Sequence, residues 1–85
     1  MSNEAAERMK SRYHALTDAV KEEHPEIPQM LYAALGTTAA NALYLYFESV
    51  RTSNVGMFQA SLLLFDSADE IYSEWKRDPE TWRTI

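Results

Sequence analysis

The sequence contains no cysteine, only two glycines and three prolines, and few basic side chains among its 85 residues. Without cysteine there is neither a disulfide framework nor a thiolate metal site. The glycines and prolines are too few for an all-β fold, which needs a turn about every ten residues. The sequence has eight basic and 13 acidic residues. The resulting net charge of −5 argues against direct binding of nucleic acid, which requires clustered Lys and Arg.

The chain also lacks the patterns that direct a protein to or through a membrane. Residues 1–7 include two acidic side chains and no apolar run, so they do not resemble a signal peptide. The longest uncharged stretch, residues 27–47, is long enough to cross a bilayer. However, it contains Pro28, Thr37 and Asn41, and an uncharged helix of this kind is typical of a protein interior. We therefore expect a cytoplasmic protein without membrane contact.

A chain of this length holds one domain, residues 1–85. Such a domain buries only about 60% of the surface that its unfolded chain exposes, so a monomer is expected to be marginally stable. Apolar residues make up 46% of the sequence, which is typical of a globular protein and not of a disordered one.

Apolar residues recur at spacings of three and four, which predicts three helices over residues 3–23, 28–51 and 55–77. The first is expected to end before Pro25, because the residue preceding a proline is pushed out of the helical conformation. We expect the second to continue through Gly36, although a glycine is able to break a helix. The apolar positions of the first helix are Met9, Tyr13, Leu16 and Val20, and those of the third are Val55, Met57, Phe58, Leu62, Leu64, Phe65, Ala68, Ile71, Tyr72 and Trp75.

After the third helix, Pro79 suits the first turn of a short final helix. Trp82 and Ile85 are expected to fold back onto the helices. The predicted fold is therefore all-α, an antiparallel three-helix bundle with a short C-terminal turn, dimerised through its middle helix.

The middle helix is apolar on two opposite sides, which we call the first and the second seam. Both follow the three-four spacing of a packed helix face. The first seam is Tyr32, Leu35, Ala39, Ala42, Tyr46 and Val50. The second seam is Met30, Ala33, Thr37, Ala40, Tyr44 and Phe47, followed at the same spacing by Arg51.

A three-helix bundle needs only one apolar side of its middle helix, so something else should cover the second seam. An uncovered apolar patch of this size would exceed what soluble monomers usually expose. The small residues Ala33, Thr37 and Ala40 allow another helix to approach closely, and we predict that a second copy of the chain does so about a two-fold axis. The alternatives are a different protein partner, or a wrapping of the first and third helices around both seams.

Four acidic residues form a stripe on the third helix. Asp66, Glu70 and Glu74 are four residues apart and share one face, and Asp69 lies beside them. Such a stripe is able to steer a partner with a basic surface, including a nucleic-acid-binding protein that it would engage by phosphate mimicry. The alternative is a solvated face that keeps the bundle soluble. The one basic cluster is Arg8, Lys10 and Arg12, which fits pairing with nearby acids, or else contact with an acidic partner or with the acidic stripe of a neighbouring subunit.

No motif for chemistry is present, and we expect no catalytic, cofactor-binding or metal-binding residues. Neither His14 nor His24 follows a glutamate at the spacing of a di-metal helical site. Gly36 and Gly56 are isolated, so there is no phosphate-binding loop.

The sequence thus favours a non-enzymatic protein–protein interaction module, such as an inhibitor or adaptor that occupies a surface on another protein. Two other hypotheses remain open. One is a structural subunit or chaperone of a hetero-oligomer. The other is an enzyme or ligand-binding protein with a pocket at a dimer interface.

Overall fold

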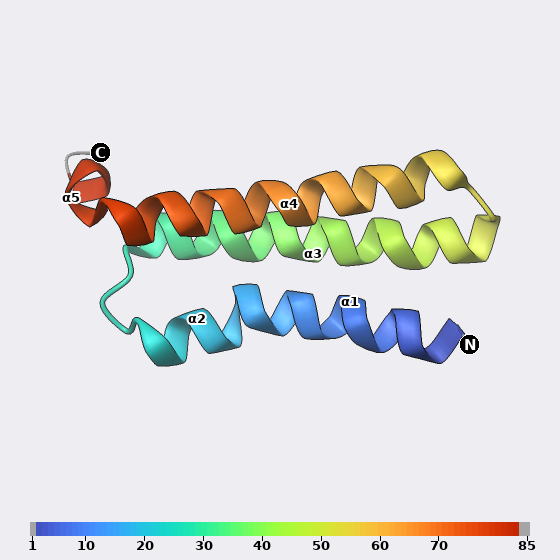
Figure 1. Ribbon diagram of the computed structural model, residues 1–85, viewed down its shortest axis with the longest axis horizontal. Coiled ribbons are helices and arrows are strands. Elements are labelled where there is room, and N and C mark those ends of the chain that lie inside the picture. The colour runs from blue at the N-terminus through green and yellow to red at the C-terminus, as the bar shows by residue number, and fades with distance from the viewer. Residues whose placement is uncertain (1, 84–85) are drawn as a thin grey trace.

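The computed structural model describes residues 2–83, and this part of the chain is helical without any strand. The helices are α1 (Ser2–Leu16), α2 (Asp18–Glu23), α3 (Gln29–Thr52), α4 (Val55–Arg77) and α5 (Pro79–Arg83). As Figure 1 shows, α3 and α4 lie side by side as an antiparallel hairpin, and α1 and α2 run one after the other along it. The predicted all-helical bundle is confirmed, and it is elongated, measuring 43 × 22 × 17 Å.

The first helix was predicted to be continuous over residues 3–23, and this was wrong, because it is interrupted at Thr17. The Thr17 hydroxyl donates a hydrogen bond to the Tyr13 carbonyl oxygen at 2.8 Å. Its backbone N–H bonds to His14 only three residues back, at 3.3 Å. A threonine hydroxyl that competes for the carbonyl four residues earlier bends a helix. The break therefore comes from a buried side chain that competes with the backbone, and α1 and α2 form separate helices.

The long middle helix, α3, was predicted correctly as a single helix. It begins after Pro28, whose carbonyl oxygen accepts a hydrogen bond from the Tyr32 N–H at 2.9 Å. It then continues without interruption through Gly36. A Cβ atom built on Gly36 would meet no other atom within 4 Å, so close packing within the protomer does not require a glycine there.

The turn between α3 and α4 is fixed by hydrogen bonds at both helix ends. Ser53 adopts the left-handed conformation with φ of 53°, and the Asn54 N–H donates to the Ser49 carbonyl oxygen at 2.9 Å. This arrangement closes the end of α3. The side-chain oxygen of Asn54 then accepts from the Met57 N–H at 3.1 Å and caps α4.

At the other end, α5 begins at Pro79 as predicted, and the Thr81 hydroxyl donates to Asp78 at 2.6 Å. Trp82 packs partly buried against the core. The predicted contact of Ile85 lies outside the described residues.

The core lies between α3 and α4 and is closed on one side by α1 and α2. Its fully enclosed members include Leu35, Ala39 and Ala42 of the first seam, together with Phe65 from α4 and Val20 from α2. Tyr46 of the same seam is buried too, and Tyr32 is half-buried.

The turn end of the hairpin is more open than the spacing predicted. Val50 is 53% exposed and Val55 is 69% exposed, although both were assigned to packed stripes. They lie in the last turn of α3 and the first turn of α4, where the two helices meet the turn.

Candidate protein-interaction surfaces

The second seam is an exposed apolar face on α3. Met30 is 81% exposed, Tyr44 62% and Phe47 41%. The small members between them, Ala33, Thr37 and Ala40, are exposed as well. The alternative in which the neighbouring helices wrap around both seams is therefore excluded within one protomer.

The helical repeat explains why this face remains open. The buried positions of α3 include Leu35, Ala39, Ala42 and Tyr46, and they recur at three and four residues on one side of the helix. The second seam follows the same spacing on the opposite side. Because α1, α2 and α4 all pack against the buried positions, no element among residues 2–83 lies over the second seam.

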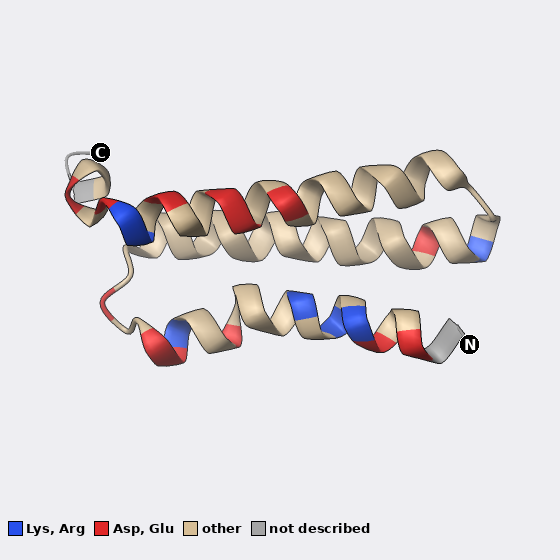
Figure 2. Cartoon of the chain, in the orientation of Figure 1, with Lys and Arg blue, Asp and Glu red and all other residues tan. Residues whose placement is uncertain are grey.

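Charge is absent from this face except near its C-terminal end. Figure 2 shows that α3 carries no charged residue before Glu48 and Arg51. Arg51 Nε donates to Glu48 Oε1 at 3.1 Å and to Oε2 at 3.2 Å. These hydrogen bonds lower the pKa of Glu48. The two charges are therefore neutralised against each other, so they oppose an apolar partner less than isolated charges would.

The acidic stripe on α4 is partly occupied within the chain. Arg12 of α1 lies between two of its members, and its Nη2 donates to Asp69 Oδ2 at 2.7 Å and to Asp66 Oδ1 at 3.1 Å. The same guanidinium lies 4.8 Å above the centre of the Phe65 ring. Burial alone would lower the pKa of Arg12, but hydrogen bonds and the charges of Asp69 and Asp66 outweigh it and raise that pKa. Half of the stripe thus attaches α1 to α4.

The other half of the stripe, Glu70 and Glu74, is exposed on α4. Neither carboxylate forms an ion pair or a side-chain hydrogen bond with another of the described residues. These two are the members of the predicted stripe that remain available to a basic partner. In the basic cluster, Arg12 makes the contact between α1 and α4, and Lys10 Nζ lies 3.8 Å from Glu7 Oε1.

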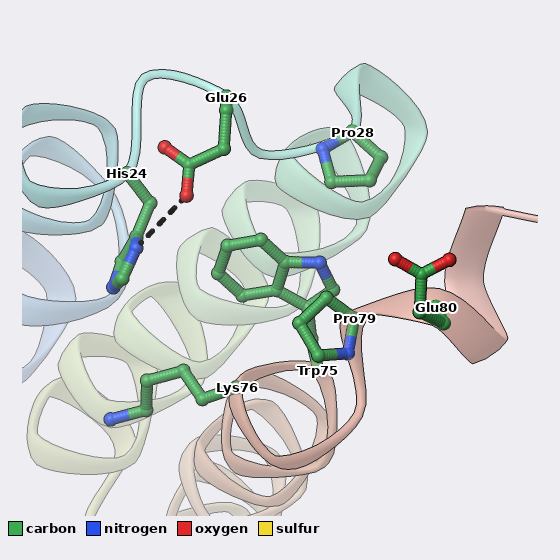
Figure 3. Close-up of a pocket in the computed structure, with 7 residues that line it drawn as sticks. All are labelled: His24, Glu26, Pro28, Trp75, Lys76, Pro79 and Glu80. Atoms are coloured by element: carbon green, nitrogen blue, oxygen red, sulfur yellow. Dashed lines mark hydrogen bonds and ion pairs between the residues drawn. The ribbon is translucent and has the colours of Figure 1, made fainter.

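A pocket of about 500 Å³ lies where the connector between α2 and α3 meets the end of α4. Figure 3 shows Trp75 in the middle of the view, between His24 on one side and Glu80 on the other. His24 Nδ1 lies 3.3 Å from Glu26 Oε2, and the His24 ring meets the Trp75 ring edge-on at 5.0 Å. Lys76, which also lines the pocket, places its Nζ 4.3 Å from the centre of the Tyr72 ring. Among the described residues, no serine, threonine or cysteine lines this pocket, so it offers no hydroxyl or thiol nucleophile.

A second hollow, of about 590 Å³, adjoins the second seam at the start of α3. Its lining is mostly apolar and includes Met30, Leu31 and Ala34 from α3, Ile71 from α4 and Trp82 from α5. Because Met30 belongs to both features, the exposed apolar surface continues from α3 onto this groove. Spacing alone did not indicate this groove, because it forms only where Trp82 of α5 comes together with Met30 of α3 and Ile71 of α4.

The histidines and acids form local pairs. His14 Nδ1 lies 2.9 Å from Asp18 Oδ2, four residues along the chain. Within residues 2–83, no group of three or more His, Cys, Asp or Glu side chains is arranged to hold a metal ion. None of the described helices combines the length and the apolar character needed to cross a membrane.

Comparison with known proteins found no matching protein family, no similar curated protein and no similar solved structure.

Proposed function

We propose that this protein is a small, non-enzymatic protein–protein interaction module that self-associates as a homodimer through the second seam of α3. In this proposal the dimer acts as an inhibitor or adaptor by occupying a surface on another protein. The observation that carries the proposal is the exposed, uncharged face formed by Met30, Ala33, Thr37, Ala40, Tyr44 and Phe47.

The physical reason is the cost of leaving this face in water. Apolar burial stabilises by about 25 cal/mol per Å², and aromatic side chains offer roughly 150–250 Å² each. At about 25 cal/mol per Å², covering Tyr44, Phe47 and Met30 therefore stabilises the protein by several kcal/mol. That gain is large for a chain of 85 residues, because small domains are marginally stable.

The second partner surface in this proposal is the unpaired half of the acidic stripe. Glu70 and Glu74 are exposed and four residues apart on α4, so they share one face. They lie on a different helix from the second seam, and a dimer formed through α3 does not use them. A partner with a basic surface is therefore expected to bind through α4, with a rate that falls as salt rises.

The proposal is tested by measuring the mass of the purified chain across the micromolar range by light scattering or sedimentation. We expect a dimer that dissociates on dilution. Ala40→Glu and Tyr44→Glu each place an unpaired charge at the centre of the face, so both should give monomers with unchanged helical circular dichroism. Leu63→Glu is the matched control, because Leu63 is an apolar α4 residue that is 67% exposed and lies outside the second seam.

A chain that stays monomeric and folded at every concentration would contradict self-association. A chain that aggregates alone, and becomes soluble only with a different protein, would favour the hetero-oligomer subunit instead. If Leu63→Glu dissociates the dimer as strongly as Ala40→Glu, the interface is not the second seam.

A further inference from the structure

Side-chain size is distributed unevenly along the second seam. The positions between Met30 and Tyr44 are small, namely Ala33, Thr37 and Ala40. Its large rings, Tyr44 and Phe47, come after them in the C-terminal half of α3. Met30, a flexible side chain, stands at the N-terminal end. The face is therefore a shallow depression followed by a ridge.

From this distribution we infer that two copies pair through α3 in an antiparallel arrangement, with the two-fold axis close to Ala40. This inference rests on the proposed self-association and specifies its geometry. In this pairing, the depression of one copy receives the ridge of the other, so that Tyr44 and Phe47 pack over the partner's small residues. The two-fold symmetry makes this contact twice, once on each side of the axis.

A parallel pairing would use the same residues less well. In that pairing Phe47 would lie opposite the partner's Phe47, and Ala33 would lie opposite the partner's Ala33. Rings would meet rings at one end while the small residues left a gap at the other, and unfilled space forfeits packing energy. The order of small and large residues thus favours the antiparallel arrangement.

The charges of α3 are compatible with this arrangement. Glu48 and Arg51 are the only charged residues of α3, and both lie near its C-terminal end. A parallel pairing would bring two Glu48–Arg51 pairs together, whereas the antiparallel pairing places Arg51 near the partner's Met30. The acidic residues of α4 do not belong to this face, so the net charge of −5 on each chain does not oppose the contact directly.

The required area implies that the two helices align along their length. A stable interface buries about 800 Å² per partner. Met30, Tyr44 and Phe47 are already partly covered within the protomer, so they do not supply this area on their own. Alignment over the 24 residues of α3, about 36 Å at 1.5 Å per residue, adds the small residues between them. A crossing angle near 20° gives such extended contact, and small side chains permit a close approach of the helix axes.

The absence of cysteine allows a direct test by disulfide trapping, because each introduced thiol is the only one in the chain. A disulfide requires Cα atoms within about 7 Å. Ala40→Cys, close to the axis, should form a covalent dimer rapidly under mild oxidation. Met30→Cys alone should not, because positions ten residues from the axis in both copies lie about 30 Å apart at 1.5 Å per residue. Mixing Met30→Cys with a tagged Arg51→Cys chain should give the mixed dimer. Leu63→Cys measures the background of random collisions, and circular dichroism establishes that each variant is folded.

The outcomes separate the geometry from the proposed function. Efficient self-linking of Met30→Cys would show a parallel pairing and overturn the inference, while self-association itself would stand. A dimer in light scattering whose Ala40→Cys variant links no faster than Leu63→Cys would place the interface elsewhere and also overturn it. A monomer at all concentrations would overturn both the inference and the proposed self-association.

Discussion

The α3–α4 hairpin and the α1–α2 segment are both helical, but they are held in place by different means. The hairpin supplies six buried residues from α3 and four from α4. The α1–α2 segment supplies Leu16, Thr17 and Val20, packs Met9 and Tyr13 partly buried against the core, and makes further contacts at its surface. Among these are the Arg12 contacts with Asp66 and Asp69, and Lys21 above the Tyr32 ring at 5.3 Å.

This difference shows how the molecule divides its apolar surface. The hairpin buries most of one side of α3, and the α1–α2 segment closes that same side. No described element is left for the opposite side, which is as free of charge as the buried side until Glu48. The segment that completes the core therefore also determines which face of α3 remains available to a partner.

The largest expected effect is the loss of a side chain from the hairpin core. Leu35 is fully buried on α3, so Leu35→Ala should lower the free energy of unfolding by about 2–5 kcal/mol, as Leu-to-Ala changes in cores do. Urea unfolding followed by circular dichroism measures this. Leu63→Ala is the control and should change the value by less than about 0.5 kcal/mol, because its side chain is mostly in water. A cost below about 1 kcal/mol for Leu35→Ala, outside the range for core residues, would mean that the first seam is not the core.

A smaller effect is expected where α1 attaches to α4. Arg12→Met keeps the length of the side chain but removes the contacts with Asp66, Asp69 and the Phe65 ring. Exposed ion pairs contribute about 0.2–1 kcal/mol each and a cation over an aromatic ring about 0.5–1, so the loss should be about 1–2 kcal/mol. Hydrogen exchange should show the loss of protection in α1 before α3 and α4.

Arg8→Met, an exposed change on the same helix, is the control for Arg12→Met. If Arg12→Met lowers protection equally in all helices, the α1–α2 segment does not open separately, and the contrast between the two regions disappears.

Gly36→Ala should raise the free energy of unfolding slightly. Alanine is favoured over glycine by about 1 kcal/mol inside a helix, and the new Cβ would meet nothing within 4 Å. Gly56→Ala is the matched comparison, because its Cβ would lie 3.3 Å from the Asn54 oxygen that caps α4, and it should gain less or lose stability. Thermal unfolding of both variants at several concentrations measures this. If Gly36→Ala is destabilising, and more so at high concentration, Gly36 lies in a contact between chains.

Sequence spacing was sufficient for much of this fold, and its failures have identifiable causes. The bounds of α3 and α4, the Asn54 cap and the two faces of α3 all follow from local patterns, because each depends on residues close in the chain. The break at Thr17 was missed because it depends on one hydroxyl competing with the backbone. The pairing of Asp66 and Asp69 with Arg12 was not predicted within the chain, since these residues are more than 50 positions apart. Spacing identified two apolar sides of α3 and assigned the second seam to a partner outside the protomer, and all six of its residues are exposed on the protomer.

The smallest expected effect concerns the contact between the end of α2 and α4 at alkaline pH. Burial, together with the charge of Glu23 and a hydrogen bond to it, raises the pKa of Tyr72 above its ordinary value of 10.0. A raised pKa in the folded state means that this tyrosine contributes stability below pH 10, which is lost as pH rises through the raised value. Ionisation would place a phenolate beside the Glu23 carboxylate and weaken the attachment of α2. The unfolding free energy of the unaltered protein should therefore fall more steeply between pH 9 and 11 than that of Tyr72→Phe, which lacks the titrating group. Urea unfolding at each pH measures both slopes, and parallel slopes would mean that Tyr72 does not link α2 to the hairpin.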